Sequence, residues 1–256
     1  MFSESDMIMY STSKQIVPTT TKDDEDNTDE PNNHKDLLYY EPDKDHFSKI
    51  IADLAEIGKS FYSRGWVLGT SGNFSAVISQ QPLRLAITST GADKGSLMSD
   101  HFLEVDDAAN VVQGHGYPSK EVLMHLSIVR CTNASAVLHT HSVPSTVLSN
   151  VYASKCGITF EGYEMLKGLE GIQTHQQCEW LPILENSQDM IKLSQTAATI
   201  LREHNCIHGF LLRGHGLYTW GSSIQQAKRH VEILEFLMEV MIRSSQYAYN
   251  TIHGTA

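Results

Sequence analysis

The sequence has no long apolar run and no recognisable export signal. No stretch of its 256 residues reaches the ~18–20 apolar residues that a membrane-spanning helix needs. The N-terminal segment lacks the basic start and apolar core of a secretory signal. The four cysteines form no C-x-x-C pair, so neither a disulfide framework nor a cysteine zinc cage is expected. We therefore expect a cytoplasmic protein with reduced thiols and no membrane partner.

Basic charge is also scarce, and the usual nucleotide-binding loops are missing. The chain has 19 Lys and Arg against 30 Asp and Glu, a formal net charge of −11. A general nucleic-acid binder needs a basic surface to neutralise phosphates, so nucleic acid is not an expected partner. No Walker loop or G-x-G-x-x-G motif occurs. What the chain does contain is 13 histidines, a number that favours metal or acid–base chemistry.

Most of the negative charge lies near the N-terminus. Residues 1–45 contain 12 acidic residues and 4 lysines, and little that could bury apolar surface. This composition predicts a disordered acidic tail. Residues 46–250 are nearly balanced in charge and long enough to bury a substantial core, so we expect them to form one catalytic domain. A balanced domain can still hold a cationic pocket for a small phosphate.

After the tail, helical and strand patterns alternate without an internal repeat. Apolar residues at three- and four-residue spacing predict helices, and short runs between Gly, Ser and Thr loops predict strands. This alternation predicts a layered α/β domain. The expected helices span residues 45–65, 121–130, 187–204 and 222–243, and the expected strands span residues 74–79, 83–88, 134–139, 207–212 and 217–220.

The sharpest chemical signal is the pair His139 and His141 at the end of an expected strand. Residues two apart in a strand point to the same side, so both imidazoles can face one ion. A catalytic zinc takes three protein ligands and leaves one position open, and the best third candidate is His215, which lies between two glycines. The alternatives are an ordinary polar strand end and an exposed turn histidine. His208 lies inside a strand pattern and is expected to be an ordinary core or surface histidine.

Two loops have the composition of anion-binding sites. Residues 69–73 and 88–94 each place small hydroxyl side chains beside glycines, and the second loop ends on a lysine. Such loops offer backbone N–H groups and hydroxyl donors to a phosphate, although each could also be a plain turn. The residues expected to contact phosphate or substrate in these loops are Thr70, Ser71, Gly72, Asn73, Ser89, Thr90, Gly91 and Lys94.

Two glutamates are candidates for acid–base work. Glu121 opens an expected helix after Pro118 and Ser119, where an acid is favourable simply because it complements the helix dipole. Glu164 lies downstream of the histidine pair, and by itself it would be taken for a surface charge. Neither glutamate is assigned a role by its spacing alone.

Five motifs follow one another along the chain: Gly-Thr-Ser-Gly-Asn-Phe-Ser at 69–75, Thr-Ser-Thr-Gly at 88–91, Pro-Ser-x-Glu at 118–121, His-x-His at 139–141 and Arg-Gly-His-Gly at 213–216. Their order resembles the class II aldolase and adducin head family. The resemblance covers about residues 46–245. It implies an α/β fold, a three-layer α/β/α domain with a central, mainly antiparallel sheet. It also implies one zinc ion per subunit and a homotetramer with sites near subunit boundaries.

Within that family, the sequence is most similar to the branch that removes water from a phosphorylated ketose. The segments that carry this likeness are residues 164–168, 181–186 and 215–221. The implied reaction is zinc-dependent dehydration of 5-methylthioribulose 1-phosphate to 2,3-diketo-5-methylthiopentyl 1-phosphate, a step of methionine salvage. By this resemblance, Glu164 is the catalytic acid/base. The implied zinc ligands are His139, His141 and His215, and Ser119 and Glu121 join the two loops at the substrate.

Two departures from the family pattern keep other functions open. Glu121 matches a glutamate that the aldolase and epimerase branches use at the metal. A zinc aldolase or 4-epimerase acting on another sugar phosphate, of the fuculose- or ribulose-phosphate type, is therefore an alternative. Some animal members carry a cysteine near the position of Ser119, and this chain has none there, so no thiol role is assigned. An adducin-like interaction module without metal is a further alternative, against which the three histidines argue.

Overall fold

The computed structural model describes residues 44–254. The expected tail, residues 1–45, lies outside the described residues except for its last two. The helices are α1 (Lys44–Ser63), α2 (Val122–Thr132), α3 (Val143–Val151), α4 (Met190–Glu203) and α5 (Ile224–His253). The strands are β1 (Asn73–Gln80), β2 (Leu83–Thr88), β3 (Phe102–Asp106), β4 (Val111–Gln113), β5 (Ala136–Thr140), β6 (Gly157–Phe160), β7 (Glu179–Leu184), β8 (Gly209–Leu212) and β9 (Gly216–Gly221). Short 3-10 segments are η1 (Lys94–Ser96), η2 (Ser99–His101), η3 (Ala153–Lys155) and η4 (Glu164–Gly168).

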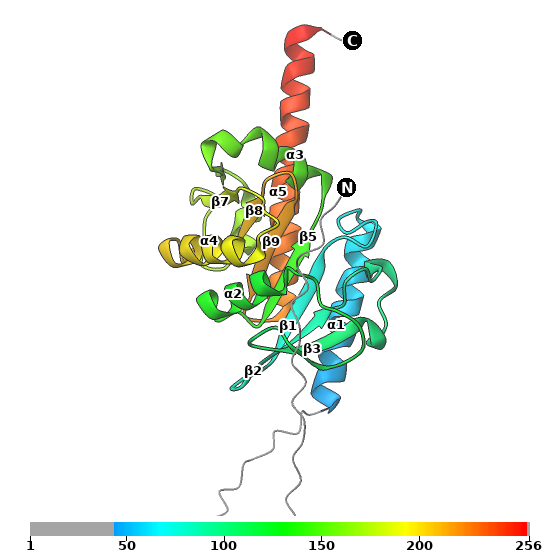
Figure 1. Cartoon of the computed structure of the whole chain (residues 1–256). Helices are drawn as coiled ribbons and strands as arrows, with labels where there is room; N and C mark the ends of the chain where they lie inside the picture. The colour runs from blue at the N-terminus through cyan, green and yellow to red at the C-terminus, as the bar shows by residue number, and fades with distance from the viewer. Residues whose placement is uncertain (1–43, 255–256) are drawn as a thin grey trace, which may run out of the picture. The chain divides into compact units, whose positions relative to one another are not determined.

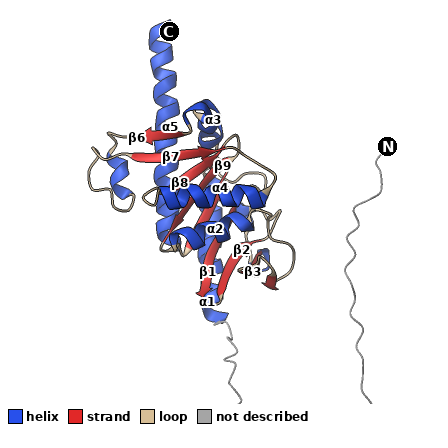
Figure 2. Cartoon of the chain, turned by 60° about the vertical axis from the view of Figure 1, so that its left-hand side comes forward, coloured by secondary structure: helices blue, strands red, loops and turns tan. Residues whose placement is uncertain are grey.

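The nine strands form one sheet in the order β4-β3-β2-β1-β5-β9-β8-β7-β6. Every neighbouring pair is antiparallel except β7 and β8, which run parallel. The prediction of a central, mainly antiparallel sheet is therefore confirmed. Figures 1 and 2 show the strands crossing the middle of the domain with helices on both sides.

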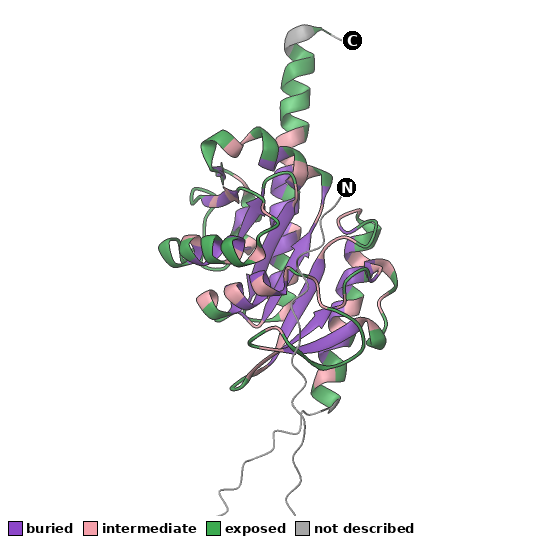
Figure 3. Ribbon diagram, viewed as in Figure 1, coloured by how far each residue is buried: buried purple, intermediate pink, exposed green. Residues whose placement is uncertain are grey.

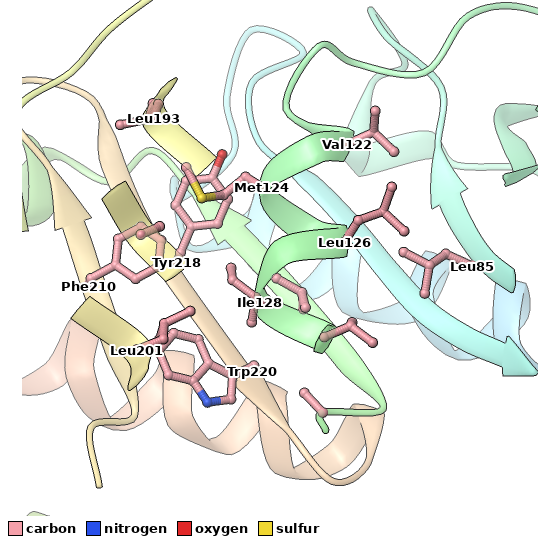
Figure 4. Packing of buried hydrophobic residues seen from close by; sticks show 14 of the residues in the cluster. Leu85, Val122, Met124, Leu126, Ile128, Leu193, Leu201, Phe210, Tyr218 and Trp220 are labelled. Atoms are coloured by element: carbon pink, nitrogen blue, oxygen red, sulfur yellow. The ribbon is translucent and has the colours of Figure 1, made fainter. Parts of the chain in front are cut away.

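Helices cover both faces of the sheet and complete the three layers. Side chains of α2 and α4 pack on one face, against Phe210 and Trp220 of the sheet (Figure 4). Helices α1 and α5 cover the other face, where Leu54 and Phe61 meet Phe74. The buried strands lie between helices whose outer surfaces are exposed, as Figure 3 shows. None of the described helices combines the length and apolar character needed to cross a bilayer.

The helices and strands expected from the sequence are present, with ends that differ by a few residues. Several further elements of the structure show no clear hydrophobic pattern in the sequence. Strand β7 contains Pro182, and β4 is exposed along its whole length, so neither shows the usual alternation. Helix α3 is short and rich in valine, which lowers its helical signal. Helix α5 continues to His253 although its apolar pattern ends about ten residues earlier, and residues 243–251 are exposed.

The central strands β1, β5 and β9 bring distant segments of the chain together where these strands begin or end. Asn73 at the start of β1 pairs with His139 of β5, and His139 in turn pairs with Tyr218 of β9. Gly216 at the start of β9 is needed for this approach, because a Cβ atom there would clash with the Thr140 carbonyl oxygen. The order β1-β5-β9 thus places residues from three parts of the chain side by side.

Candidate functional site

His139, His141 and His215 converge on one point. His139 is the fourth residue of β5, His141 directly follows that strand, and His215 lies in the turn between β8 and β9. The Nε2 atom of His139 lies 2.8 Å from that of His141 and 3.3 Å from that of His215. His139 is fully buried, and the other two are partly buried. Among the residues that the structure describes, they form the one group of three His, Cys, Asp or Glu side chains close enough to share a metal ion.

The protonation of these histidines suits a metal. The Nδ1–H of His139 donates to the Leu217 carbonyl oxygen at 3.0 Å, which leaves the Nε2 lone pair facing the cluster. Burial lowers the pKa of all three imidazoles, that of His141 to about 4. Neutral imidazoles are the form that binds zinc. In a tetrahedral site with zinc–nitrogen bonds of about 2.0–2.1 Å, ligand nitrogens lie about 3.3 Å apart. The His139–His215 distance of 3.3 Å matches this spacing and the His139–His141 distance of 2.8 Å is shorter, so a small shift of one ring fits the cluster to zinc.

Glu121, the N-cap residue of α2, also reaches the cluster. Its Oε1 atom lies 3.3 Å from His215 Nε2 and 3.7 Å from His139 Nε2. Its Oε2 atom accepts a hydrogen bond from Asn73 Nδ2. The carboxylate is therefore held beside the three imidazoles, a placement that the sequence did not distinguish from a helix-dipole role.

A cavity of about 160 Å³ adjoins the cluster. His141 forms part of its wall and joins it to the histidine cluster. Every residue that the sequence predicts at the phosphate or substrate lines it. These residues are Thr70, Ser71, Gly72, Asn73, Ser89, Thr90, Gly91, Lys94, Ser119 and Glu121.

Lys94 supplies the positive charge of this cavity. Its Nζ donates to the carbonyl oxygens of Thr70 at 3.0 Å and Ala92 at 2.7 Å, so its third proton is free for another acceptor. Burial lowers the pKa of Lys94 to about 8, and the charges of Asp93 and Glu121 oppose this shift. The Ser71 hydroxyl is buried without a hydrogen-bond partner among the described residues. The cavity therefore offers unused donors to an anion.

Glu164 lies elsewhere. It starts η4, its side chain is 71% exposed, and it pairs with Lys167 at 2.9 Å and His175 at 3.4 Å. The hydrogen bond and charge of Lys167 lower the pKa of Glu164. It lines no part of the 160 Å³ cavity. The described chain thus brings Glu121, and not Glu164, to its own histidine cluster.

Several buried residues that the sequence did not single out support the site. The ring of Tyr218 stacks on His139, with centroids 3.8 Å apart. Thr140 Oγ1 donates to the buried Glu235 of α5 at 3.0 Å. His125 contacts Asn73 and lies four residues after Glu121, on the same face of α2. That spacing was a usable signal for His125, whereas the other two contacts depend on the sheet order.

A larger cavity of about 600 Å³ opens at the opposite end of β9. Glu179 and His208 line it, but they already pair with each other at 3.0 Å. His230, also on its wall, uses Nδ1 to donate to the Trp220 carbonyl oxygen. None of the predicted site residues lies there. The smaller cavity, which adjoins the three histidines, is therefore the candidate site.

Comparisons with known proteins identify the family and the fold of this chain. The family model described as Class II Aldolase and Adducin N-terminal domain matches residues 52–242. A methylthioribulose-1-phosphate dehydratase of Methylococcus capsulatus is 41% identical over 198 residues, which cover 77% of this chain and 95% of that protein. A protein of the same name from Yersinia enterocolitica is 43% identical over 177 residues, covering 69% of this chain and 83% of that protein. The solved structure of a putative aldolase/epimerase/decarboxylase from Escherichia coli has a TM-score of 0.64 and 26% identity, over 78% of this chain and 90% of that chain.

Proposed function

The chain belongs to the class II aldolase and adducin N-terminal domain family, and we propose that it is a hydro-lyase acting on 5-methylthioribulose 1-phosphate. The reaction removes water and forms 2,3-diketo-5-methylthiopentyl 1-phosphate, a step of methionine salvage. The observation that carries the proposal is the cluster of three imidazoles beside a cavity that offers donors to an anion. It occurs in a chain that is 41% identical to a methylthioribulose-1-phosphate dehydratase. We expect the substrate phosphate to occupy the cavity, where Lys94 and the hydroxyl groups offer donors.

Zinc is the proposed cofactor, one ion per subunit, held by His139, His141 and His215. Support comes from their converging Nε2 atoms and from the Leu217 carbonyl, which selects the tautomer of His139 that metal binding requires. When bound there, zinc supplies Lewis acidity toward the carbonyl and hydroxyl oxygens of the ketose. The Oε1 atom of Glu121 lies beside the three imidazoles, where it can accept a hydrogen bond from a substrate hydroxyl and orient it.

We propose Glu164 as the acid/base that delivers a proton to the departing hydroxyl, acting from a neighbouring subunit of a homotetramer. Its exposure leaves it free to reach a second chain. Val143, Val147 and Val151 form an exposed apolar stripe along α3, which begins two residues after His141. An apolar stripe on a helix so close to the site favours contact with another subunit there.

A zinc aldolase or 4-epimerase acting on another sugar phosphate is the second candidate. The observation in its favour is that Glu121, the glutamate used by those branches, lies 3.3 Å from His215 Nε2. In that case Glu121 is the working acid and Glu164 a surface charge.

Turnover of two variants separates the candidates. Zinc-loaded protein is incubated with methylthioribulose 1-phosphate, and the diketone is measured. The dehydratase proposal expects Glu164→Gln to retain zinc but lose ~10²–10⁴-fold in turnover, because an amide cannot exchange the proton. Glu121→Gln should be the milder change. Carbon–carbon cleavage, or near-normal dehydration by Glu164→Gln, would contradict the proposal.

A further inference from the structure

The Glu121 carboxylate is tied to the protein interior through a chain of three buried side chains. Its Oε1 faces the histidines, and its Oε2 accepts from Asn73 Nδ2. Asn73 Oδ1 lies 2.5 Å from His125 Nε2, and His125 Nδ1 lies 2.7 Å from Ser75 Oγ. All three are buried, His125 and Ser75 fully.

The direction of each hydrogen bond in this chain follows from the carboxylate. The Asn73 amide presents its NH₂ group to Glu121, and the carboxylate Oε2 accepts the hydrogen bond from Asn73 Nδ2. Its carbonyl oxygen then faces His125, which must donate from Nε2–H. The Nδ1 atom of His125 consequently carries the lone pair and accepts from the Ser75 hydroxyl. One imidazole tautomer alone satisfies all three bonds.

The reverse orientation of the Asn73 amide is strongly disfavoured. It would place the amide oxygen against the Glu121 carboxylate, and no tautomer of His125 can relieve that contact. Buried polar groups left without partners cost about 1–3 kcal/mol each. Burial also lowers the pKa of His125 to about 3, so the ring carries a single proton at neutral pH. A fully paired network of this kind is rigid.

We infer that His125 is a positioning residue, which fixes the Asn73 amide so that this amide holds the Glu121 carboxylate beside the three histidines. His125 does not line the cavity, so it acts through Asn73 and touches no substrate. The inference rests on the proposed function only in that the histidines bind zinc. It extends the site one layer inward, from the carboxylate to the core of α2 and β1.

Zinc affinity tests this inference without reference to turnover. Groups behind a metal site typically contribute 10–100-fold to metal affinity or activity. We expect His125→Leu to weaken zinc binding by about that factor in competition with a chromogenic chelator. His125→Gln, whose amide can still donate to Asn73, should stay within a few-fold of the unmodified protein. The double variant His125→Leu/Glu121→Gln should bind zinc no more weakly than Glu121→Gln alone, because both changes interrupt one chain.

His230→Leu is the matched control. Like His125, His230 is a buried histidine on a helix. Its hydrogen bond goes to the Trp220 carbonyl oxygen, at the end of β9 away from the three histidines. The substitution His230→Leu should lower the stability of the fold without lowering its affinity for zinc. Equal zinc loss in His125→Leu and His230→Leu, or additive losses in the double variant, would overturn the inference.

The tautomer gives an independent measurement on the unmodified protein, should His125→Leu fail to fold. Nitrogen-15 NMR of the imidazole side chains is expected to show His125 with its proton on Nε2 and none on Nδ1. A proton on Nδ1 would overturn the inference. If zinc affinity and tautomer behave as expected while methylthioribulose 1-phosphate is not consumed, the proposed function fails and the positioning role stands.

Discussion

At the scale of single residues, burial decides the charge of the groups around the cavity. Desolvation lowers the pKa of buried bases and raises that of buried acids, because it penalises the charged form. Lys94 and His125 show the first effect, with pKa values of about 8 and about 3. Glu235, buried beneath Thr140, shows the second, with a pKa raised to about 7. Two of these residues make testable contributions near neutral pH.

Lys94→Met should weaken substrate binding and remove a pH dependence. The Lys94 ammonium is charged below its pKa of about 8, so its attraction for phosphate is present at pH 7 and is lost as the pH rises through 8. A hydrogen bond from a charged group is worth about 1.5–3 kcal/mol, so kcat/KM should fall about 10–100-fold at pH 7. In the variant, the fall in kcat/KM between pH 7 and 9 that comes from the loss of the Lys94 charge should be absent.

Lys228→Met serves as the control, because Lys228 is a surface lysine of α5 that pairs with Glu232 at 2.7 Å. Its kcat/KM should match that of the unmodified protein at every pH. If kcat/KM of Lys94→Met at pH 7 equals that of Lys228→Met, Lys94 does not bind the substrate phosphate.

Glu235→Gln should stabilise the protein at alkaline pH. The folded-state pKa of Glu235, about 7, lies above its unfolded value of 4.5, so its stability contribution is greatest below pH 4.5 and is lost as the pH rises through 7. The shift corresponds to a loss of about 3 kcal/mol above pH 7. The amide carries no charge and can still accept from Thr140. Denaturant unfolding at pH 6 and pH 9 should show the gain of the variant growing with pH, and a constant difference would contradict this account.

At the scale of elements, the site depends on how closely β5 and β9 approach each other. The turn before β9 carries His215, and β5 carries His139. Ser142 caps α3 by accepting from the Ser145 N–H, so the chain leaves β5 in a defined direction just after His141. The three candidate ligands are therefore held in place by the ends of two strands and by the capped start of α3.

Gly216→Ala should reduce zinc binding as well as stability. The added methyl group would press on the Thr140 carbonyl and come within 3.2 Å of His139 Cε1, so the strands must separate. Overpacking of this kind typically costs about 1–3 kcal/mol. Thermal unfolding and zinc titration should both show a loss.

Gly171→Ala separates a general loss of stability from a loss at the site. Gly171 has a φ of +78° and no atom within 4 Å of an added Cβ, so alanine there costs roughly 1–2 kcal/mol of backbone strain alone. Its zinc affinity should be unchanged. Normal zinc affinity in Gly216→Ala would show that the strand contact does not set the metal geometry.

At the scale of the whole molecule, the two glutamates raise the question of which chain completes a site. Glu121 reaches the histidines of its own chain, whereas Glu164 faces solvent. If a neighbouring subunit supplies Glu164, each site draws its histidines from one chain and its acid from another. This arrangement has a consequence for mixed oligomers.

Oligomers that mix His139→Ala and Glu164→Gln chains should regain activity, although each variant alone is inactive. A site with histidines from the second chain and the glutamate from the first is complete. Random mixing at equal amounts gives roughly a quarter of sites in that state, if each site has one donor neighbour. Dehydration of methylthioribulose 1-phosphate after co-refolding, compared with each variant refolded alone, measures this. Absence of any recovery in mixed oligomers would place Glu164 outside the neighbouring site.

Local pattern was sufficient for the features that depend on neighbours in the sequence. The period of a strand puts His139 and His141 on one side, and the three- and four-residue spacing of Leu54, Ile57 and Phe61 identifies the buried face of α1. Glycine and hydroxyl residues in succession marked residues 69–73 and 88–94 as loops that can hold an anion. Because these signals lie within a few residues of each other, the sequence by itself determined the layered α/β fold and the pair His139 and His141, whereas His215 was added through its glycine turn and the family resemblance.

Contacts between distant segments were decided only by the tertiary structure. The sheet order β1-β5-β9 sets Asn73 beside His139, and it is α2 packed on that sheet that carries Glu121 to the cluster and His125 to Asn73. The sequence favoured Glu164 through a resemblance, yet in the described chain that side chain is exposed and away from the cavity. Strand pairing joins residues more than sixty positions apart, and no local period encodes which strands become neighbours.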